Sequence, residues 1–142
     1  MCIKEMYIRG APAIGAAAAF GMALAAQQSK ASTPQELLAD LDLASDVIGA
    51  TRPTAINLFW AVRRMMQTAK ESSGPDVAGI VAEMIVEAKH IADEDVGINR
   101  RMGAHGATLV EDEAGKICNI LTHCNAGALA TVDYGTALAV IR

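Results

Sequence analysis

Through most of its first 110 residues the chain repeats apolar residues every three or four positions, as in helices that each bury one face. The best-marked of these helices starts at Thr33-Pro34-Gln35-Glu36. This is a capping box, with a capping hydroxyl, a Pro at the first helical position and a Glu at the third. The helix is predicted to end near Gly49, and its apolar positions are Leu37, Leu38, Leu41, Ala44, Val47 and Ile48.

A longer pattern predicts another helix face, formed by Val77, Ile80, Val81, Met84, Ile85, Ala88 and Ile91. The acidic run Asp93-Glu94-Asp95 is expected to interrupt or recap this helix before Ile98 to Val110. Gly103 and Gly106 weaken the helix around His105 and are expected to let another backbone approach. The first part of the chain is therefore predicted to be a bundle of helices.

Two further helices are preceded by an Arg and a Pro. Arg9-Gly10-Ala11-Pro12 leads into an Ala-rich stretch whose small residues predict a central helix, and Arg52-Pro53 leads into an apolar helix running to about Ser72. Free N–H groups at a helix start, together with a guanidinium, can hold an oxyanion. Arg9 and Arg52 are thus candidates for anion binding, although such residues also serve as surface ion-pair or capping groups.

A cysteine marks the end of an apolar run near the C-terminus. Residues 117–122 have strand character, stop at the polar residues that follow, and give way to helix-compatible sequence from Ala128 onward. This pattern predicts a strand, a tight turn and a helix start, where the helix dipole favours the thiolate of Cys124. The alternative is that Cys124 is a small buried hydrophobe. His123 is expected to orient the turn or to donate a hydrogen bond to a carbonyl.

The composition narrows the function classes. The chain has 142 residues, of which 52% are hydrophobic and only 4% aromatic, a mixture typical of packed helices. Its net charge is −4 without a basic block, so nucleic acid is not an expected partner. The stretch Ala11 to Ala26 is too short and too weakly apolar to span a membrane. His90 and His105 lack metal-ligand spacing, and neither a metal nor a cofactor is expected.

Three cysteines without a Cys-x-x-Cys pair, and a start without a signal-peptide pattern, predict reduced thiols in the cytoplasm. The polar turn at residues 111–116 suggests a division into a helical domain, 1–115, and a second unit, 116–142. The last residues, from Thr131 to Arg142, continue as helix without a C-terminal cap. The chain is therefore expected to be unfinished.

Residues 6–15, 51–58 and 120–131 resemble the three signature stretches of the methylthioribose-1-phosphate isomerases. That family belongs to a wider one, with the regulatory subunits of initiation factor 2B and the ribose-1,5-bisphosphate isomerases. The resemblance implies a helical N-terminal domain followed by the first strand–helix unit of a truncated Rossmann-like domain, a mainly α fold with a short α/β end. It also implies a homodimer that converts 5-methylthioribose 1-phosphate into 5-methylthioribulose 1-phosphate in methionine salvage.

The same resemblance assigns roles to single residues. Cys124 is the proton-transferring residue, with proton relay and hydride shift both left open. Ala126 stands where a Thr is common, which removes a hydroxyl beside Cys124. The acid/base partner is an Asp of the later domain, to which no position here corresponds. The substrate-binding residues are Arg9, Gly10, Ala11 and Arg52, and the supporting residues are His123, Asn125 and Gly127.

Three alternatives remain open on the sequence. The chain can be a ribose-1,5-bisphosphate isomerase, a regulatory or assembly subunit resembling the initiation-factor relatives, or an inactive fragment. Retention of Cys124, Arg9 and Arg52 favours the enzyme branch. Because the partner carboxylate is missing, the 142 residues alone are expected to show no turnover.

Overall fold

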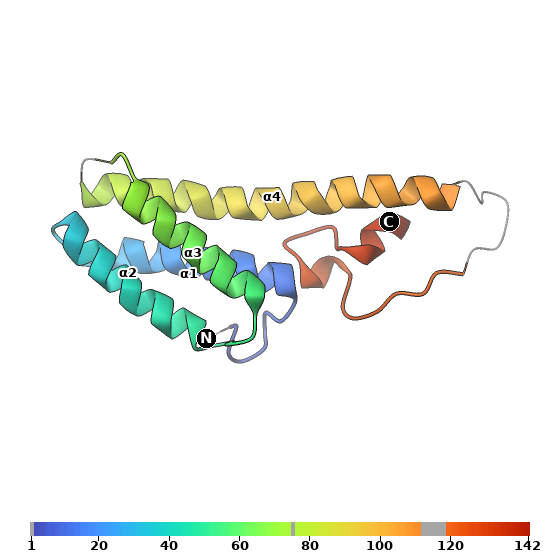
Figure 1. Cartoon of the computed structure of the whole chain (residues 1–142), viewed down its shortest axis with the longest axis horizontal. Coiled ribbons are helices and arrows are strands. Elements are labelled where there is room, and N and C mark those ends of the chain that lie inside the picture. Colours follow the sequence, from blue (N-terminus) through green and yellow to red (C-terminus); the bar gives the residue numbers. More distant parts are fainter. Residues whose placement is uncertain (1, 75, 112–118) are drawn as a thin grey trace.

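Helices make up most of the protein in a computed structural model that describes residues 2–74, 76–111 and 119–142. Figure 1 shows four α-helices followed by a shorter C-terminal segment. The α-helices are α1 (Ala11–Gln28), α2 (Pro34–Gly49), α3 (Ile56–Glu71) and α4 (Val77–Glu111), and two short 3₁₀ helices follow, η1 (Ala128–Ala130) and η2 (Ala137–Ile141). The predicted helical bundle is confirmed.

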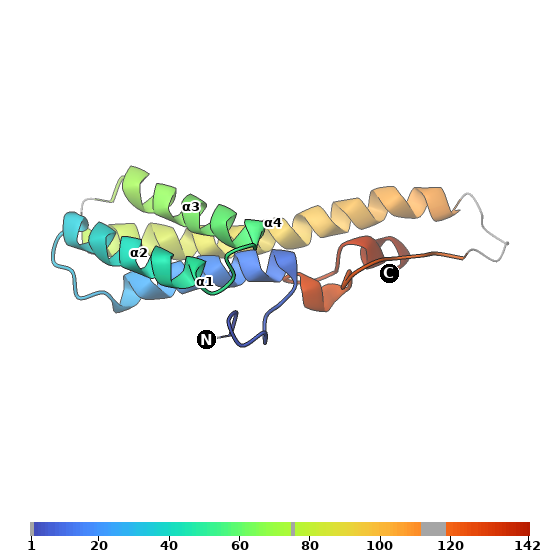
Figure 2. The ribbon, with the colours of Figure 1, turned by 60° about the horizontal axis from the view of Figure 1, so that its bottom comes forward.

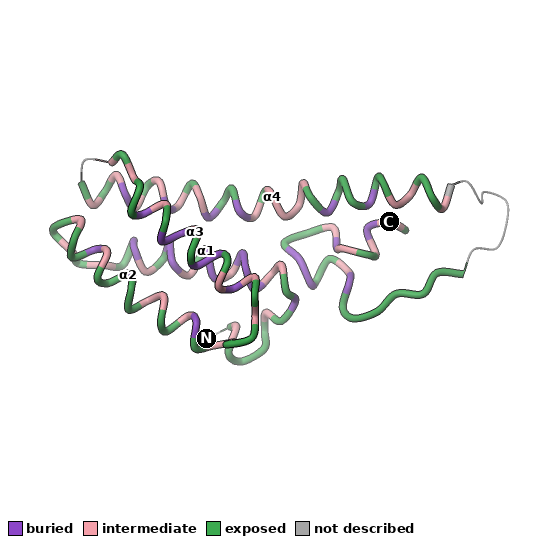
Figure 3. The backbone as a smooth tube through the Cα atoms, in the orientation of Figure 1, coloured by how far each residue is buried: buried purple, intermediate pink, exposed green. Residues whose placement is uncertain are grey.

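Helix α1 is the centre of the bundle and packs against α2, α3 and α4. Because its residues are small, it is buried on several sides at once, as the purple stretches in Figure 3 show. At Gly15 a Cβ atom would lie 3.2 Å from the carbonyl oxygen of Asn57, so α1 and the start of α3 come close together. The core consists of Met22 of α1, Leu37 and Leu41 of α2, Met65 of α3 and Met84 of α4, together with smaller neighbours.

The helix boundaries follow local chemistry. At the start of α2 the Thr33 hydroxyl accepts from the Glu36 N–H at 3.3 Å, and the Glu36 carboxylate accepts from the Thr33 N–H at 3.2 Å. The predicted capping box is therefore confirmed, as is the end of this helix at Gly49. Helix α3 begins three residues after Pro53, because the Ala55 N–H first closes a turn onto the Arg52 carbonyl at 3.0 Å.

Helix α4 runs without a break from Val77 to Glu111, so the predicted interruption at the acidic run is wrong. Two of these acidic residues have partners: the Glu94 carboxylate accepts from Arg64 at 2.5 Å, and Asp95 accepts from the Val132 N–H at 2.8 Å. Paired carboxylates do not disturb the helix. The expected close approach farther along is confirmed, because a Cβ at Gly103 would lie 2.6 Å from the Ala139 carbonyl oxygen.

The C-terminal segment differs from its prediction. Residues 119–123 form no regular secondary structure, and two 3₁₀ turns replace the expected α-helix; residues 117 and 118 of the expected strand lie outside the described part. Leu121 is 99% exposed and no described strand pairs with its neighbours, so the run has no partner for its backbone groups. The segment instead lies along the second half of α4, where η2 contacts that helix (Figure 2).

Candidate functional site

Cys124 lies in an exposed bend of the C-terminal segment, between exposed His123 and Asn125. Its φ of 68° falls in the left-handed region that non-glycine residues rarely adopt. The predicted turn is thus present. The α-helix start expected beside the thiol is not, because the following turn, η1, has only three residues and begins at Ala128. A helix dipole at Cys124 is therefore not part of this structure, and the physical basis expected for stabilising the thiolate is missing.

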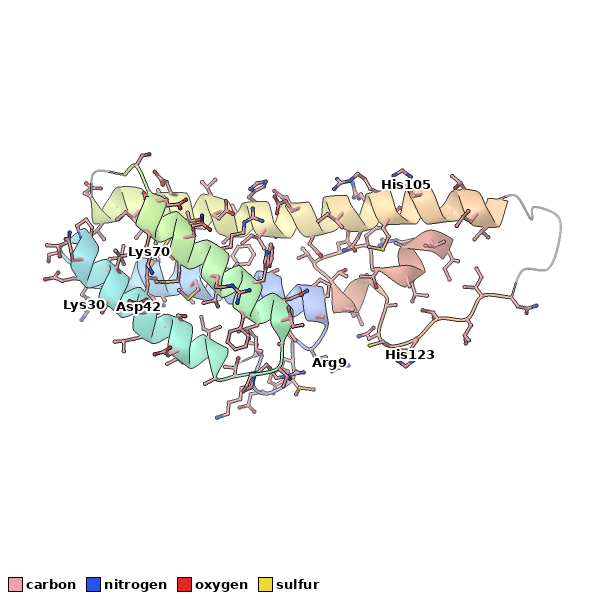
Figure 4. All side chains as sticks on the ribbon, in the orientation of Figure 1. Arg9, Lys30, Asp42, Lys70, His105 and His123 are labelled. Carbon is pink, nitrogen blue, oxygen red and sulfur yellow. The ribbon has the colours of Figure 1, made fainter. Side chains whose placement is uncertain are left out.

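Arg9 and Gly10 lead directly into α1, and Figure 4 shows Arg9 at that end of the helix. Gly10 is the N-cap residue, and no side chain caps the first turn. A Cβ at Gly10 would lie 2.2 Å from the Cα of Ala130, so the loop that follows Cys124 sits on the start of α1 and requires a glycine there. Arg9 itself is exposed, as is Ala11.

Arg52 is half-buried in the turn before α3, and its Nη1 atom lies 2.9 Å from the sulfur of Met6. This contact brings the segment before Arg9 against the turn that holds Arg52. Within the described ranges, neither arginine forms an ion pair with a carboxylate. Thioether sulfur is only a weak hydrogen-bond acceptor, so both positive charges are available to an anion.

A cavity of about 260 Å³ lies beside the start of α1 and is lined by residues of two signature segments and by one residue that follows the third. Pro12 and Gly15 of α1 line it, as do Asn57 of α3 and Thr136 of the C-terminal segment. The Thr136 N–H donates to the Ala126 carbonyl at 2.9 Å, which ties the cavity wall to the loop that carries Cys124 two residues earlier.

Chain length limits how far each arginine can lie from the wall of this cavity. Arg9 is three residues ahead of Pro12 and Arg52 five ahead of Asn57, so their Cα atoms lie within about 11 and about 18 Å of those wall residues. The close approaches of Gly10 to Ala130 and of Gly15 to Asn57 bring the segments of Arg9, Arg52 and Cys124 together at the start of α1, beside this cavity. The lining residues of the cavity do not include Arg9, Arg52 or Cys124.

Two amide side chains add polar groups to the cavity. Asn99 of α4 is 2% exposed, and its Nδ2 atom has no hydrogen-bond partner among the described residues. Asn57 is half-buried on the opposite helix. Asn99 did not stand out in the sequence, although it lies eight residues after Ile91 and so continues the apolar face of its helix. A polar residue at a position on the apolar face was the signal in the sequence that could have identified it.

Carboxylates of α4 form another part of the cavity wall. Glu94 and Asp95 both line it. The hydrogen bond from Arg64 holds the pKa of the Glu94 carboxyl below its usual range, and the same bond raises the pKa of the guanidinium. Arg64 also bonds Glu87 and lies 5.5 Å from the ring of Trp60, a further cavity residue. This cluster joins α3 to α4 and fixes Glu94 in its ionised form.

A larger hollow of about 650 Å³ lies between α1 and α2, and no charged side chain is among its lining residues. Ile8 and Thr51, which belong to two of the signature segments, are among its lining residues, whereas the segment that carries Cys124 contributes none. The described ranges contain no group of three or more His, Cys, Asp or Glu side chains placed to hold a metal ion. None of the helices in these ranges combines the length and apolar character that crossing a membrane requires.

Comparison with known proteins gives consistent results. Residues 7–142 match the Initiation factor 2 subunit family. The methylthioribose-1-phosphate isomerase of Koribacter versatilis is 53% identical over 142 residues, which is all of this chain and 39% of that protein. The putative methylthioribose-1-phosphate isomerase of Pyrococcus horikoshii is 50% identical, over 99% of this chain and 37% of that protein. The chain thus spans about two fifths of the length of these relatives.

Two solved structures share the fold. The crystal structure of 5-methylthioribose 1-phosphate isomerase from Pyrococcus horikoshii OT3 matches with a TM-score of 0.85 and 50% identity, covering 99% of this chain and 38% of that one. The structure of the translation initiation factor eIF-2B, subunit delta, from A. fulgidus matches with a TM-score of 0.84 and 46% identity, covering 99% of this chain and 39% of that one.

Proposed function

The chain belongs to the Initiation factor 2 subunit family. We propose that it functions as part of an aldose–ketose isomerase that converts 5-methylthioribose 1-phosphate into 5-methylthioribulose 1-phosphate. The observation that carries the proposal is the meeting of the three signature segments at the start of α1, where Gly10 lies against Ala130 and Gly15 against Asn57, beside a cavity that Pro12 and Asn57 line. Two unpaired arginines before this cavity suit a sugar phosphate, because guanidinium and backbone N–H groups both bind phosphate oxygens.

The conversion moves a hydrogen between adjacent carbons, by a proton relay or by a hydride shift. A phosphate on the anomeric oxygen blocks simple opening to a free aldehyde, so an acid and a base must act around a shielded sugar. General acid–base groups of this kind contribute about 10²–10⁴-fold in rate. In the proposal Cys124 is one of them, while Arg9, Gly10, Ala11 and Arg52 hold the phosphorylated sugar.

The surrounding residues have supporting roles. The Cys124 loop is shaped by His123, Asn125 and Gly127. The carbonyl of Ala126 accepts a hydrogen bond from the Thr136 N–H, and its side chain has no hydroxyl to offer the substrate. We assign residues 116–142 to the first strand–helix unit of a Rossmann-like domain, formed when further strands pair with it, and residues 1–115 to the helical domain. The reaction needs reduced Cys124 and is assigned to the cytoplasm, in a homodimer.

Binding to the 142-residue chain tests the proposal. Isothermal titration with 5-methylthioribose 1-phosphate is expected to show saturable binding, weakened at least about tenfold by Arg52→Ala, because one charge-assisted hydrogen bond to phosphate is lost. Arg101→Ala, an exposed residue of α4, is the matched control and should bind like the parent. Equal binding by the Arg52 and Arg101 variants would remove the anion-binding role.

Testing the role of Cys124 requires a turnover assay, and therefore a longer family member that carries this sequence. Cys124→Ser is expected to abolish conversion while sparing substrate binding, because the thiol transfers a proton and does not hold the phosphate. An active Ser variant would exclude Cys124 as the acid/base group. The 142 residues alone should bind but not convert the substrate, since they contain no counterpart of the family's later Asp.

A regulatory or assembly subunit is the second candidate, favoured by the similarity to the structure of the translation initiation factor eIF-2B, subunit delta. Such a subunit would share the fold without the sugar chemistry. Titration with nucleotides beside 5-methylthioribose 1-phosphate separates the two functions. Selective binding of the sugar phosphate supports the isomerase, and selective binding of a nucleotide supports the regulatory subunit.

A further inference from the structure

We propose that Thr131 and Asp95 are positioning residues for Cys124. Together they hold the turn that follows the cysteine in one conformation and dock it on α4. The inference rests on the proposed function, in which Cys124 is an acid/base group, and it adds two residues that act on the thiol through the backbone of this turn. Neither of them is among the site residues that the sequence motifs predict.

The chain turns back on itself directly after Cys124. Ala126, two residues later, is buried, and its carbonyl accepts from the N–H groups of Thr136 at 2.9 Å and Leu138 at 3.3 Å. A Cβ at Gly135 would lie 2.9 Å from the same carbonyl oxygen, so the returning backbone packs directly on it. The position of Cys124 therefore depends on how the returning segment is folded.

Thr131 fixes the fold of the returning segment. It is 5% exposed, and its hydroxyl accepts from the Gly135 N–H at 3.2 Å and donates to the Asp133 carbonyl at 2.9 Å. These two hydrogen bonds span Tyr134, whose φ of 82° lies in the left-handed region that non-glycine residues rarely adopt. Opening the turn would leave buried polar groups without partners, so the hydroxyl stabilises an otherwise unfavourable backbone conformation.

Asp95 docks the same turn on α4. Its carboxylate accepts from the N–H of Val132, the residue after Thr131, at 2.8 Å, and a hydrogen bond to an ionised acceptor is stronger than one between neutral groups. On the other side of the turn Ala130 packs against Gly10, where a Cβ would lie 2.2 Å from the Ala130 Cα. The turn is thus held between α4 and the start of α1.

The place of the thiol affects the rate of the reaction more than the binding of substrate. Cys124 is exposed, so its own side chain has little packing to fix it, and its position is set by the neighbouring turn. Proton transfer requires an approach of about 2.6–3.2 Å between heavy atoms, and a misplacement of about 1 Å can cost about 10²-fold in rate. The arginines assigned to the phosphate lie on other segments, so loosening the turn should leave substrate binding largely intact.

Steady-state kinetics of the longer family member that carries this sequence test the role of Thr131. Thr131→Val removes the hydroxyl and keeps the shape of the side chain. It is expected to lower kcat at least about tenfold and to change KM less than about threefold. Thr131→Ser keeps the hydroxyl and should retain kcat within about threefold of the parent. Thr108→Val is the matched control, because the hydroxyl of Thr108 is exposed and donates to the His105 carbonyl of its own helix at 2.8 Å.

Asp95 gives an independent variant on another element, which provides the test if circular dichroism shows that Thr131→Val does not fold. Asp95→Ala removes the acceptor of the Val132 N–H and should lower kcat at least about tenfold, again with little change in KM. Asp95→Asn keeps an oxygen that can accept this hydrogen bond and should restore most of the rate. Asp93→Ala, at an exposed position two residues earlier on α4, should behave like the parent.

Amide hydrogen exchange in the intact 142-residue chain tests the hydrogen bonds themselves. Exchange at Gly135 should accelerate at least about tenfold in Thr131→Val, and exchange at Val132 should do so in Asp95→Ala, whereas the Thr108 and Asp93 controls should match the parent. Unchanged exchange would overturn the inference.

The kinetics separate failure of the inference from failure of the proposed function. If Cys124→Ser is inactive while Thr131→Val and Asp95→Ala keep the kcat of their controls, or raise KM alone, the inference is overturned and the proposed function stands. The same holds if Thr131→Ser and Asp95→Asn lose as much activity as the variants they should rescue. An active Cys124→Ser protein would overturn the acid/base role of Cys124 and the inference with it.

Discussion

Replacing Asn99 by Leu should make the unliganded protein more stable, although the position is buried and polar. Asn99 is 2% exposed, and its Nδ2 atom has no partner in the described part of the chain. An unsatisfied buried polar group costs about 1–3 kcal/mol, and Leu removes that cost. Leu also favours a helix interior more than Asn does, by a few tenths of a kcal/mol.

The opposing effect is size. Leu is bulkier than Asn, and overpacking a filled core costs about 1–3 kcal/mol. Asn99, however, borders the cavity of about 260 Å³, which gives the larger side chain room. The net expectation is a gain of about 1–2 kcal/mol in the free energy of unfolding. For a chain of this size that corresponds to a rise of about 3–8 °C in melting temperature.

Urea unfolding followed by far-ultraviolet circular dichroism measures this change. The slope of the free energy of unfolding against urea concentration should be the same in parent and variant, as a check for two-state behaviour. Asn119→Leu is the matched control: the same substitution at an exposed residue should change the free energy by less than about 0.5 kcal/mol. A loss of more than about 1 kcal/mol in Asn99→Leu would show that the amide is satisfied in the folded protein and would refute the reasoning.

Three further outcomes are expected, each measurable by chemical unfolding. Arg64→Met should lower stability by about 1–2 kcal/mol, because it leaves carboxylates of the α3–α4 cluster without their cation. Since Arg64 lowers the folded-state pKa of Glu94, the stability that this pair contributes is present above the unfolded pKa of about 4.5 and is lost as pH falls through the lower folded value. The free energy of unfolding of Arg64→Met should therefore decrease less steeply than that of the parent as the pH is lowered, and equal slopes in acid would contradict the pairing. Gly103→Ala should destabilise the protein, because the new Cβ would lie 2.6 Å from the Ala139 carbonyl oxygen. In the control Gly97→Ala, on the same helix, the new Cβ meets only the flexible end of Arg101 at 3.3 Å, and the protein should gain up to about 1 kcal/mol in stability. Equal effects of the two substitutions would exclude the close approach at Gly103.

The bundle could be predicted from the sequence because its signals are local. The capping box at Thr33 and the three-to-four spacing of apolar residues act within one helix, and both appear in the structure. The acidic run Asp93-Glu94-Asp95 gave a wrong prediction because its partners, Arg64 and Val132, come from other segments. Sequence spacing does not reveal such partners.

The C-terminal segment and the site show the same limit. A strand needs neighbouring strands, so the apolar run before Cys124 did not determine its own structure. The motifs singled out Arg9, Arg52 and Cys124 as residues of interest. That their segments meet at the start of α1 followed only from the packing of Gly10 on Ala130 and of Gly15 on Asn57. Asn99 and Glu94 could be assigned to the wall of the cavity only once that packing was known.

The unbroken α4 acts mechanically as a lever. Its 35 residues span about 52 Å, so a tilt of about 5° at the Val77 end would displace the far tip by about 4.5 Å. Arg64 of α3 holds α4 near its middle, at Glu87 and Glu94, while η2 packs on the far half of α4. The placement of η2 relative to the rest of the bundle therefore depends on the angle at which α4 packs.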